Sequence, residues 1–271
     1  MPPMRAHLLA RLSLPTPGAP GQRHPHPQGQ VIVKLPLLRS AAFLRRVNRF
    51  RAEVFIDGSY AAAHVPNSGR LTDLLRPYVP VYVHPATRPG RKTAYDLLLV
   101  QYTDQVLVSI DARLPPKLFA EALPTGLFDG WLRAPGDQWE VQTEPAHGEG
   151  RLDLYLSGPQ NSAWWIETKS VTLVNRGVAL FPDAPTARGR RHLADLCALA
   201  QRGQRAAVIF LVQRPDAESF APHPEADPKF PAVLQQAADC GVAVHAYTCR
   251  VSLTHIEIER AIPVSLTPPR D

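Results

Sequence analysis

The chain has little cysteine and no long apolar run. Its three cysteines, Cys197, Cys240 and Cys249, are odd in number and lack the C-x-x-C spacing of metal or redox sites. This pattern predicts reduced thiols in the core of a cytosolic protein. A helical membrane span needs about 18 consecutive apolar residues, and a secretory signal needs an uninterrupted apolar region near the N-terminus. The sequence contains neither, so we expect a soluble, cytoplasmic protein without a membrane partner.

Acidic residues are absent from residues 1–30 and are unevenly distributed beyond them. Residues 1–30 carry three arginines and many prolines without helix or strand periodicity, which predicts a disordered extension. Residues 31–120 hold 13 Lys or Arg against 6 Asp or Glu (net +7), whereas residues 121–271 hold 14 against 18 (net −4). The first region should attract a polyanion and the second a cation, and nucleic acid with a metal ion satisfies both.

Turn residues and hydrophobic alternation predict two domains, at 31–112 and 113–271. Short strands are expected in the first domain at 43–56, 61–65, 79–83, 95–102 and 106–110. Such a run is typical of a small barrel, and an OB-like barrel is a common platform for nucleic acid. The second domain is expected to have helices at 115–123, 186–202 and 228–240 and strands at 140–146, 152–156, 164–174, 206–213 and 242–248. That order predicts an α/β domain whose mixed central sheet is flanked by helices.

Asp153, Glu167 and Lys169 point most directly to chemistry. Glu167 and Lys169 are two residues apart on an apolar strand and therefore share one face. A turn at 158–161 predicts a hairpin that brings Asp153 beside Glu167. Two carboxylates suit Mg²⁺, with Mn²⁺ as the alternative ion, and the lysine would orient or activate an attacking water. The alternative is a surface ion pair on an edge strand, which the apolar neighbours disfavour because charge on a covered strand is costly.

Cations gather at the predicted start of the helix at 186–202. Arg188, Arg190, Arg191 and His192 lie in its first two turns, where each exposed cation costs about 0.3–1 kcal/mol unless an anion is near. A bound phosphate would supply that anion, and neutralisation by a nearby acidic side chain is the alternative.

Basic and amide side chains also cluster in one strand and two turns of the first domain, where they could bind phosphate. With Arg188 and His192 of the helix predicted at 186–202, they form the set of residues expected to contact nucleic acid. The residues of the first domain in this set are Arg45, Arg46, Asn48, Arg49, Asn67, Arg70, Arg91 and Lys92. For any single arginine a solvated surface role is the alternative, so the prediction depends on the clustering.

Seven blocks, in one order, resemble the bacterial and archaeal sugar fermentation stimulation protein A family. They are 43–50 (FLRRVNRF), 64–70 (HVPNSGR), 90–93 (GRKT), 109–115 (SIDARLP), 151–153 (RLD), 166–173 (IETKSVTL) and 181–193 (FPDAPTARGRRHL). The resemblance implies an OB-like N-terminal domain, a C-terminal domain of the PD-(D/E)xK nuclease type, DNA binding and a role in regulating sugar metabolism genes. It also implies that Asp153, Glu167 and Lys169 are the nuclease triad and that Glu144 is a further metal ligand. Thr168 stands where relatives usually have valine, a change that removes no charge.

Two functions are consistent with these features. The first is a nucleic-acid-binding protein with a Mg²⁺-dependent nuclease site, and the second is a catalytically silent DNA-binding regulator of sugar metabolism genes. The intact triad favours the enzyme, because a pure binder would gain stability by neutralising a buried charged cluster. A third hypothesis is an accessory protein that binds a sugar phosphate or nucleotide. DNA is the expected partner, with RNA as the alternative.

Overall fold

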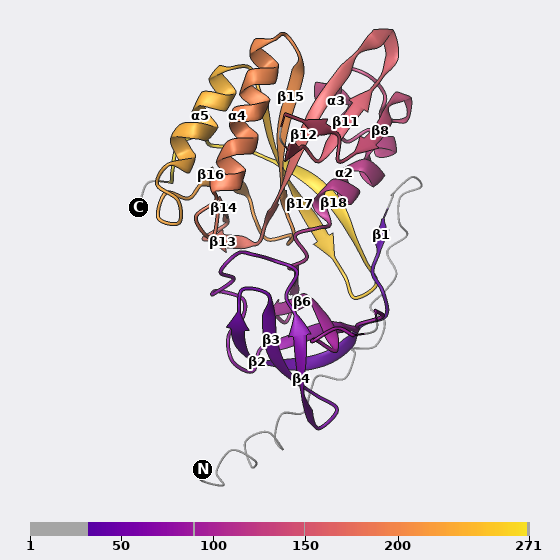
Figure 1. The fold of residues 1–271 in the computed structure, drawn as a ribbon, viewed down its shortest axis with the longest axis vertical. Helices are drawn as coiled ribbons and strands as arrows, with labels where there is room; N and C mark the ends of the chain where they lie inside the picture. The colour runs from indigo at the N-terminus through magenta and orange to yellow at the C-terminus, as the bar shows by residue number, and fades with distance from the viewer. Residues whose placement is uncertain (1–31, 89, 149, 270–271) are drawn as a thin grey trace. The chain divides into compact units, whose positions relative to one another are not determined.

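Short alternating strands in the first domain close into a barrel (Figure 1). The computed structural model describes residues 32–88, 90–148 and 150–269, so the disordered extension expected at 1–30 lies outside the described residues. The strands of the barrel are β2 (Arg39–Asn48), β3 (Arg51–Ile56), β4 (Ser59–His64), β5 (Pro80–Pro85), β6 (Tyr95–Thr103) and β7 (Val106–Ser109). They pair in the order β4-β3-β2-β5-β6-β7, and a short parallel pairing of β4 with β6 closes the ring. The OB-like barrel is therefore confirmed.

One strand of the barrel was predicted wrongly. A single strand was expected at 43–56, but the chain turns between β2 and β3. The side-chain oxygen of Asn48 accepts a hydrogen bond from the backbone N–H of Phe50 at 2.9 Å. This local bond is typical of asparagine in turns, and it makes the segment a hairpin.

The second domain is built on a seven-stranded mixed sheet. In chain order its strands are β1 (Val33–Lys34), β8 (Glu140–Thr143), β11 (Leu154–Ser157), β12 (Ala163–Val171), β15 (Arg205–Val212), β17 (Ala243–Val251) and β18 (His255–Ile262). They pair in the order β1-β18-β17-β15-β12-β11-β8. β15 is parallel to both β12 and β17, and the other pairs are antiparallel. β1 precedes the barrel in the chain yet belongs to this sheet, so the start of the predicted first domain lies structurally in the second.

Helices cover both faces of this sheet, as predicted (Figure 1). They are α2 (Pro115–Ala122), α3 (Asp129–Leu132), α4 (Ala187–Gln201) and α5 (Phe230–Asp239), with short 3₁₀ turns η2 (Leu123–Thr125), η3 (Gly136–Gln138) and η4 (Pro159–Asn161). One apolar core lies between the sheet and α2 and α3, and another lies between the sheet and α4 and α5. The second core matters for the site, because it packs α4 against β15, the strand next to β12.

Two small sheets complete the second domain. They are a ribbon of β9 (Ala146–His147) and β10 (Gly150–Arg151), and a three-stranded sheet of β13 (Leu173–Asn175), β14 (Val178–Phe181) and β16 (Ser219–Pro222). The strand expected at 164–174 therefore ends at Val171, and the chain continues into a different sheet. The segment between β14 and α4 is brought beside the end of β12 in this way.

The expectation of reduced cysteines is wrong for two of the three. Cys197 on α4 and Cys240 after α5 are joined by a disulfide with a Cα–Cα distance of 5.3 Å, within the range that a disulfide needs. The 43-residue separation hides the pairing in the sequence, because only the packing of α4 on α5 brings the two together. Cys249 is a buried free thiol, as expected. Among the described residues, no helix is long and apolar enough to cross a membrane.

Candidate active site

Strand alternation places Glu167 and Lys169 of β12 on the face that α4 covers. The side chain of Glu167 is only 2% exposed and that of Lys169 only 12%. The ammonium of Lys169 contacts Oε1 of Glu167 as an ion pair. The two charges are thus held together in a buried setting, where either one without its partner would be costly.

Asp153 reaches this face through the expected hairpin. β11 and β12 pair antiparallel with Leu154 opposite Ile166, so Asp153 comes next to Glu167. Oδ2 of Asp153 accepts hydrogen bonds from the backbone N–H and the hydroxyl of Thr168, at 2.8 and 2.6 Å. Burial raises the pKa of Asp153, and the negative charge of Glu167 raises it further. A cation between the two carboxylates would relieve that repulsion.

The two oxygens of Glu167 have different surroundings. Burial opposes ionisation of this carboxyl group, but Lys169 and His192 together outweigh burial and lower its pKa. Oε1 contacts both Lys169 and His192, whereas the buried Oε2 has no hydrogen-bond partner among the described residues. A buried charged oxygen without a partner is costly, so this atom has a free position for a ligand.

α4 supplies His192 and Arg188 to the same site. The hydroxyl of Thr186 accepts a hydrogen bond from the backbone N–H of Gly189 at 3.1 Å and so caps the helix. Arg188 Nε lies 3.3 Å from His192 Nε2. A guanidinium can only donate, so Nε2 accepts, and Nδ1 carries the proton that is donated to Glu167. The predicted pair of residues four apart thus forms a chain of contacts that ends at Glu167.

A cavity of about 600 Å³ contains these groups. It is lined by Asp153, Glu167, Lys169, Arg188 and His192 from the second domain, together with residues of the barrel. The barrel contributes Arg49 and the loop at 67–69. The site therefore lies where the two domains meet.

Two further residues of the cavity were not among the predicted site residues. Arg113 lines the wall and binds Asp111 through two side-chain contacts of 2.7 and 2.6 Å. Asp183 lines it too, and accepts a hydrogen bond from the backbone N–H of Leu71 in the barrel at 3.2 Å. Both residues lie in sequence blocks that resemble the family, at 109–115 and 181–193, and this resemblance could have identified them as candidate site residues.

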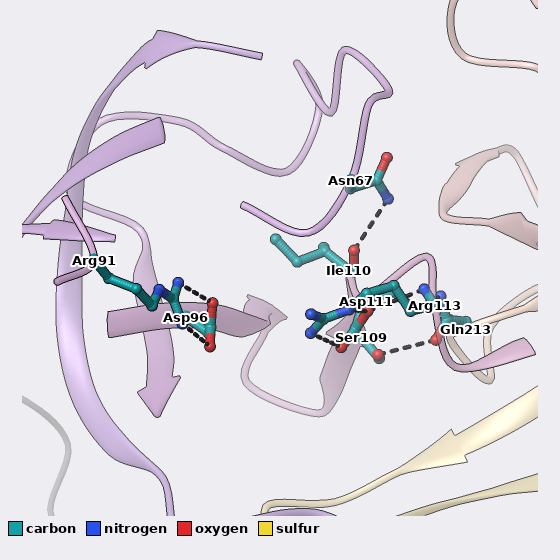
Figure 2. Close-up of polar contacts among 8 residues, drawn as sticks. All are labelled: Asn67, Arg91, Asp96, Ser109, Ile110, Asp111, Arg113 and Gln213. Atoms are coloured by element: carbon teal, nitrogen blue, oxygen red, sulfur yellow. Dashed lines mark hydrogen bonds and ion pairs between the residues drawn. The ribbon is translucent and has the colours of Figure 1, made fainter. Parts of the chain in front are cut away.

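A buried polar network joins the barrel to the second domain (Figure 2). The hydroxyl of Ser109 and the side-chain oxygen of Gln213 lie 3.0 Å apart, and the amide of Gln213 donates to the carbonyl of Asp111 at 3.1 Å. The amide of Asn67 donates to the carbonyl of Ile110 at 3.1 Å. The Asn67 bond lies within the barrel, whereas the Gln213 contacts cross to it, and separating the domains would leave Ser109 and Gln213 buried without these partners.

Several barrel residues that were expected to contact nucleic acid have partners within the protein. Arg46 donates to the carbonyls of Gly69, Arg70, Arg49 and Asn67 at 2.5 to 3.0 Å, and so holds the loop at 67–70. Asn67 binds Ile110, as described above, and its Oδ1 accepts from the backbone N–H of Gly69. The geometry thus gives Arg46 and Asn67 structural roles in the wall of the cavity.

The other predicted contact residues are spread over the barrel surface. Arg45 pairs with Glu53 at 2.8 Å, and Arg91 pairs with Asp96 at 2.7 Å (Figure 2). Asn48 forms the β2–β3 turn. Exposed side chains are found at Arg49, Arg70 and Lys92, and of these only Arg49 lines the cavity in the described structure. The structure therefore brings Arg49, Asn67, Arg188 and His192 together at the cavity, and leaves the other predicted contact residues elsewhere.

The residues present fit a divalent cation held by two carboxylates. Glu144 lines the cavity, but its carboxylate pairs with Arg151 at 3.1 Å and its side chain is 73% exposed. In the described ranges no group of three His, Cys, Asp or Glu is arranged to hold a metal ion, so the expected three-carboxylate set is not assembled. Mg²⁺ commonly uses one or two carboxylates and completes its shell with water and substrate phosphate. Asp153 and Glu167, with the unpartnered Oε2, meet that requirement.

Comparison with known proteins identifies the family. The model of the sugar fermentation stimulation protein RE domain matches residues 113–255, and that of the SfsA N-terminal OB domain matches residues 44–110. The chain belongs to the sugar fermentation stimulation protein family. A homolog from Desulforamulus reducens is 44% identical over 234 residues, covering 86% of this chain and 95% of the relative. One from Moorella thermoacetica is 44% identical over 241 residues, covering 87% of this chain and all of the relative.

A solved structure of the family has the same fold. Pyrococcus furiosus SfsA, described as a complex with Ca²⁺, superposes with a TM-score of 0.78 at 31% identity. The match covers 87% of this chain and 99% of the archaeal one. The barrel followed by a mixed sheet is thus an arrangement that this chain shares with a solved family member.

Proposed function

We propose that this SfsA-family protein binds nucleic acid and hydrolyses its phosphodiester bonds with the aid of a divalent cation. The observation that carries the proposal is the meeting of Asp153, Glu167 and Lys169 in one cavity, with Oε2 of Glu167 buried and unpartnered. Charge retained in a buried cleft is typical of functional sites. The net charge of +7 over residues 31–120 supports a polyanionic substrate.

Asp153 and Glu167 would hold Mg²⁺, or Mn²⁺ as the alternative. When bound, such an ion lowers the pKa of a water molecule and neutralises charge that develops on the phosphate. The Ca²⁺ named for the Pyrococcus furiosus relative is also a hard cation that prefers oxygen ligands, which supports an oxygen-ligand site in the family.

The remaining side chains have roles that follow from their charge. Lys169 would orient the attacking water and stabilise negative charge at the reacting phosphate. Arg188 and Arg113, both exposed to the cavity, would hold the phosphate through their guanidinium groups. His192 keeps the carboxylate of Glu167 in position through its Nδ1 contact.

A cleavage assay tests this function. Labelled single-stranded DNA, duplex DNA and RNA are incubated with the protein in Mg²⁺, Mn²⁺ or EDTA, and binding is measured in parallel at several salt concentrations. We expect cleavage with Mg²⁺ or Mn²⁺ but not in EDTA. Affinity should fall steeply with salt, by about 0.9 in the log–log slope for each phosphate contacted on duplex DNA. Absence of cleavage of any substrate in either metal would refute the nuclease.

A DNA-binding regulator without turnover is the second candidate. The observation in its favour is that Lys169 and His192 both contact Glu167 in the protein without substrate. A lysine bound in this way would serve structure and not catalysis. Salt-sensitive DNA binding without metal-dependent cleavage would support this candidate.

A further inference from the structure

Three aromatic rings lie beside the carboxylates on the same face of the sheet. Trp165 is two residues before Glu167 on β12, and Tyr155 is two residues after Asp153 and opposite Trp165 in the β11–β12 pairing. Residues two apart on a strand share a face and are about 6.6 Å apart. The ring centroids of Trp165 and Tyr155 are 4.8 Å apart, and His147 from the β9–β10 ribbon lies 5.3 Å from Trp165.

These rings are accessible and have cationic neighbours. Trp165, Tyr155 and His147 are each partly exposed. Trp165 and Tyr155 line a second cavity, of about 860 Å³, whose lining also contains the exposed Arg133 and Arg205. A hollow with an aromatic wall and two guanidinium groups matches a nucleotide, whose base stacks on rings and whose phosphate pairs with arginine.

Two further arginines lie at the β9–β10 ribbon, which carries His147. Arg151 of β10 is largely exposed, with 66% of its side chain accessible. A Cβ added to Gly150 would lie 3.7 Å from the guanidinium of Arg191 on α4, so Arg191 reaches the β9–β10 ribbon as well. Arg151 pairs with Glu144, and Arg191 adds a second guanidinium beside the ribbon.

We propose that Trp165 and Tyr155 form a stacking platform for unpaired bases of a nucleic-acid strand that also reaches the neighbouring cavity of Asp153 and Glu167. The substrate class is therefore nucleic acid with a single-stranded segment at the site, and the proposal rests on the nucleic-acid-binding function above. Bases in a duplex are already stacked and paired, so they are not available to the platform. DNA and RNA share the chemistry that the platform recognises, because every base has a π-face.

The test is a binding cycle in EDTA, so its readout does not depend on metal or turnover. Fluorescence anisotropy measures binding of a labelled single-stranded DNA, the matching RNA, a duplex, and an abasic strand with the same number of phosphates. The parent protein should bind base-bearing strands about tenfold more tightly than the abasic strand. Trp165→Leu should remove that difference, and Trp165→Phe should restore most of it by keeping a ring.

A matched control separates stacking from packing. The indole Nε1 of Trp165 lies 2.6 Å from the side-chain oxygen of Gln204, so Gln204→Ala removes that bond but leaves the ring in place. Because Gln204 also lines the hollow, the control readout is the ratio of affinities, and Gln204→Ala should keep the preference for base-bearing strands over the abasic strand. Equal binding of base-bearing and abasic strands by the parent would overturn the platform, and this comparison needs no variant to fold. An equal effect of Trp165→Leu on duplex and single strands would also overturn it.

The outcomes distinguish the platform from the function on which it rests. If the parent binds base-bearing and abasic strands alike, nucleic-acid binding stands and the platform fails. If the parent binds no strand at low salt, the proposed function and the platform both fail. A preference for RNA over DNA of the same sequence would identify RNA as the source of the stacked bases, and the reverse would identify DNA.

Discussion

Replacing Gly69 with alanine should disrupt the junction between the barrel and the second domain. A Cβ at this position would lie 2.6 Å from Cγ of Asp183, closer than side chains can approach. Asp183 cannot withdraw freely, because it accepts the hydrogen bond from Leu71 and faces the guanidinium of Arg46. The backbone of Gly69 is not in the left-handed region, so the effect of alanine is steric and not conformational.

The expected cost is about 3 kcal/mol in the free energy of unfolding. Overpacking costs about 1–3 kcal/mol. Displacing Asp183 adds the loss of a hydrogen bond to a charged acceptor, which is worth about 1.5–3 kcal/mol. Partial relaxation should keep the total near the lower end of the summed range of about 2.5–6 kcal/mol. For a chain of this size that corresponds to a fall in Tm of about 10 °C.

Urea denaturation followed by tryptophan fluorescence measures this cost. Gly130→Ala in α3 is the matched control, because no atom lies within 4 Å of its added Cβ, and helical alanine should be neutral or stabilising by up to about 1 kcal/mol. In an Asp183→Ala background, Gly69→Ala should cost far less, because the obstructing carboxylate is gone. A Gly69→Ala protein within about 0.5 kcal/mol of the parent would refute the steric reasoning.

Three other outcomes are expected. Lys169→Ala should lose orders of magnitude in metal-dependent cleavage but bind DNA in EDTA almost as the parent does, and parental cleavage would contradict its role. Arg46→Ala should lower the free energy of unfolding by about 2 kcal/mol in urea titrations, because four carbonyls lose their donor. Arg45→Ala, which removes an exposed ion pair, is the control and should cost under about 1 kcal/mol. Equal costs for the two variants would be inconsistent with the structure. Reducing the Cys197–Cys240 disulfide, which closes a 43-residue loop, should lower the free energy of unfolding by about 4 kcal/mol. Thiol titration of the unfolded but unreduced protein should find one free cysteine and not three.

The hairpin that carries Asp153 and Glu167 could be predicted because its signals are local. Alternation fixes which side chains share a face, and a turn-rich segment between two apolar strands fixes which strands pair. The same local signals predicted α4 and placed Arg188 with His192, since residues four apart meet on a helix. Local patterns were thus enough to assemble most of the charged cluster.

Arg46 and the cysteines show what local patterns leave undetermined. Arg46 was expected to face a phosphate, but its donors are used by a loop more than twenty residues away. The sequence shows an arginine but does not show whether its hydrogen-bond acceptor is a phosphate or a backbone carbonyl. Only the tertiary packing distinguishes the two acceptors. The β2–β3 turn was missed for a related reason, because strand-forming residues on both sides of Asn48 concealed one side-chain hydrogen bond.

The predicted domain boundary at 112/113 separates two folds but not two functions. Arg49 and the loop at 67–69 come from the barrel, yet they line the cavity that contains Asp153 and Glu167. The contacts that hold the barrel there, including Ser109 with Gln213 and Leu71 with Asp183, are polar and largely buried. Each buried polar group left unpaired costs about 1–3 kcal/mol, so either domain alone would lose stability as well as part of the cavity wall. Under the proposed function, the basic barrel and the acidic sheet would act as one site, in which one part attracts the polyanion and the other holds the cation.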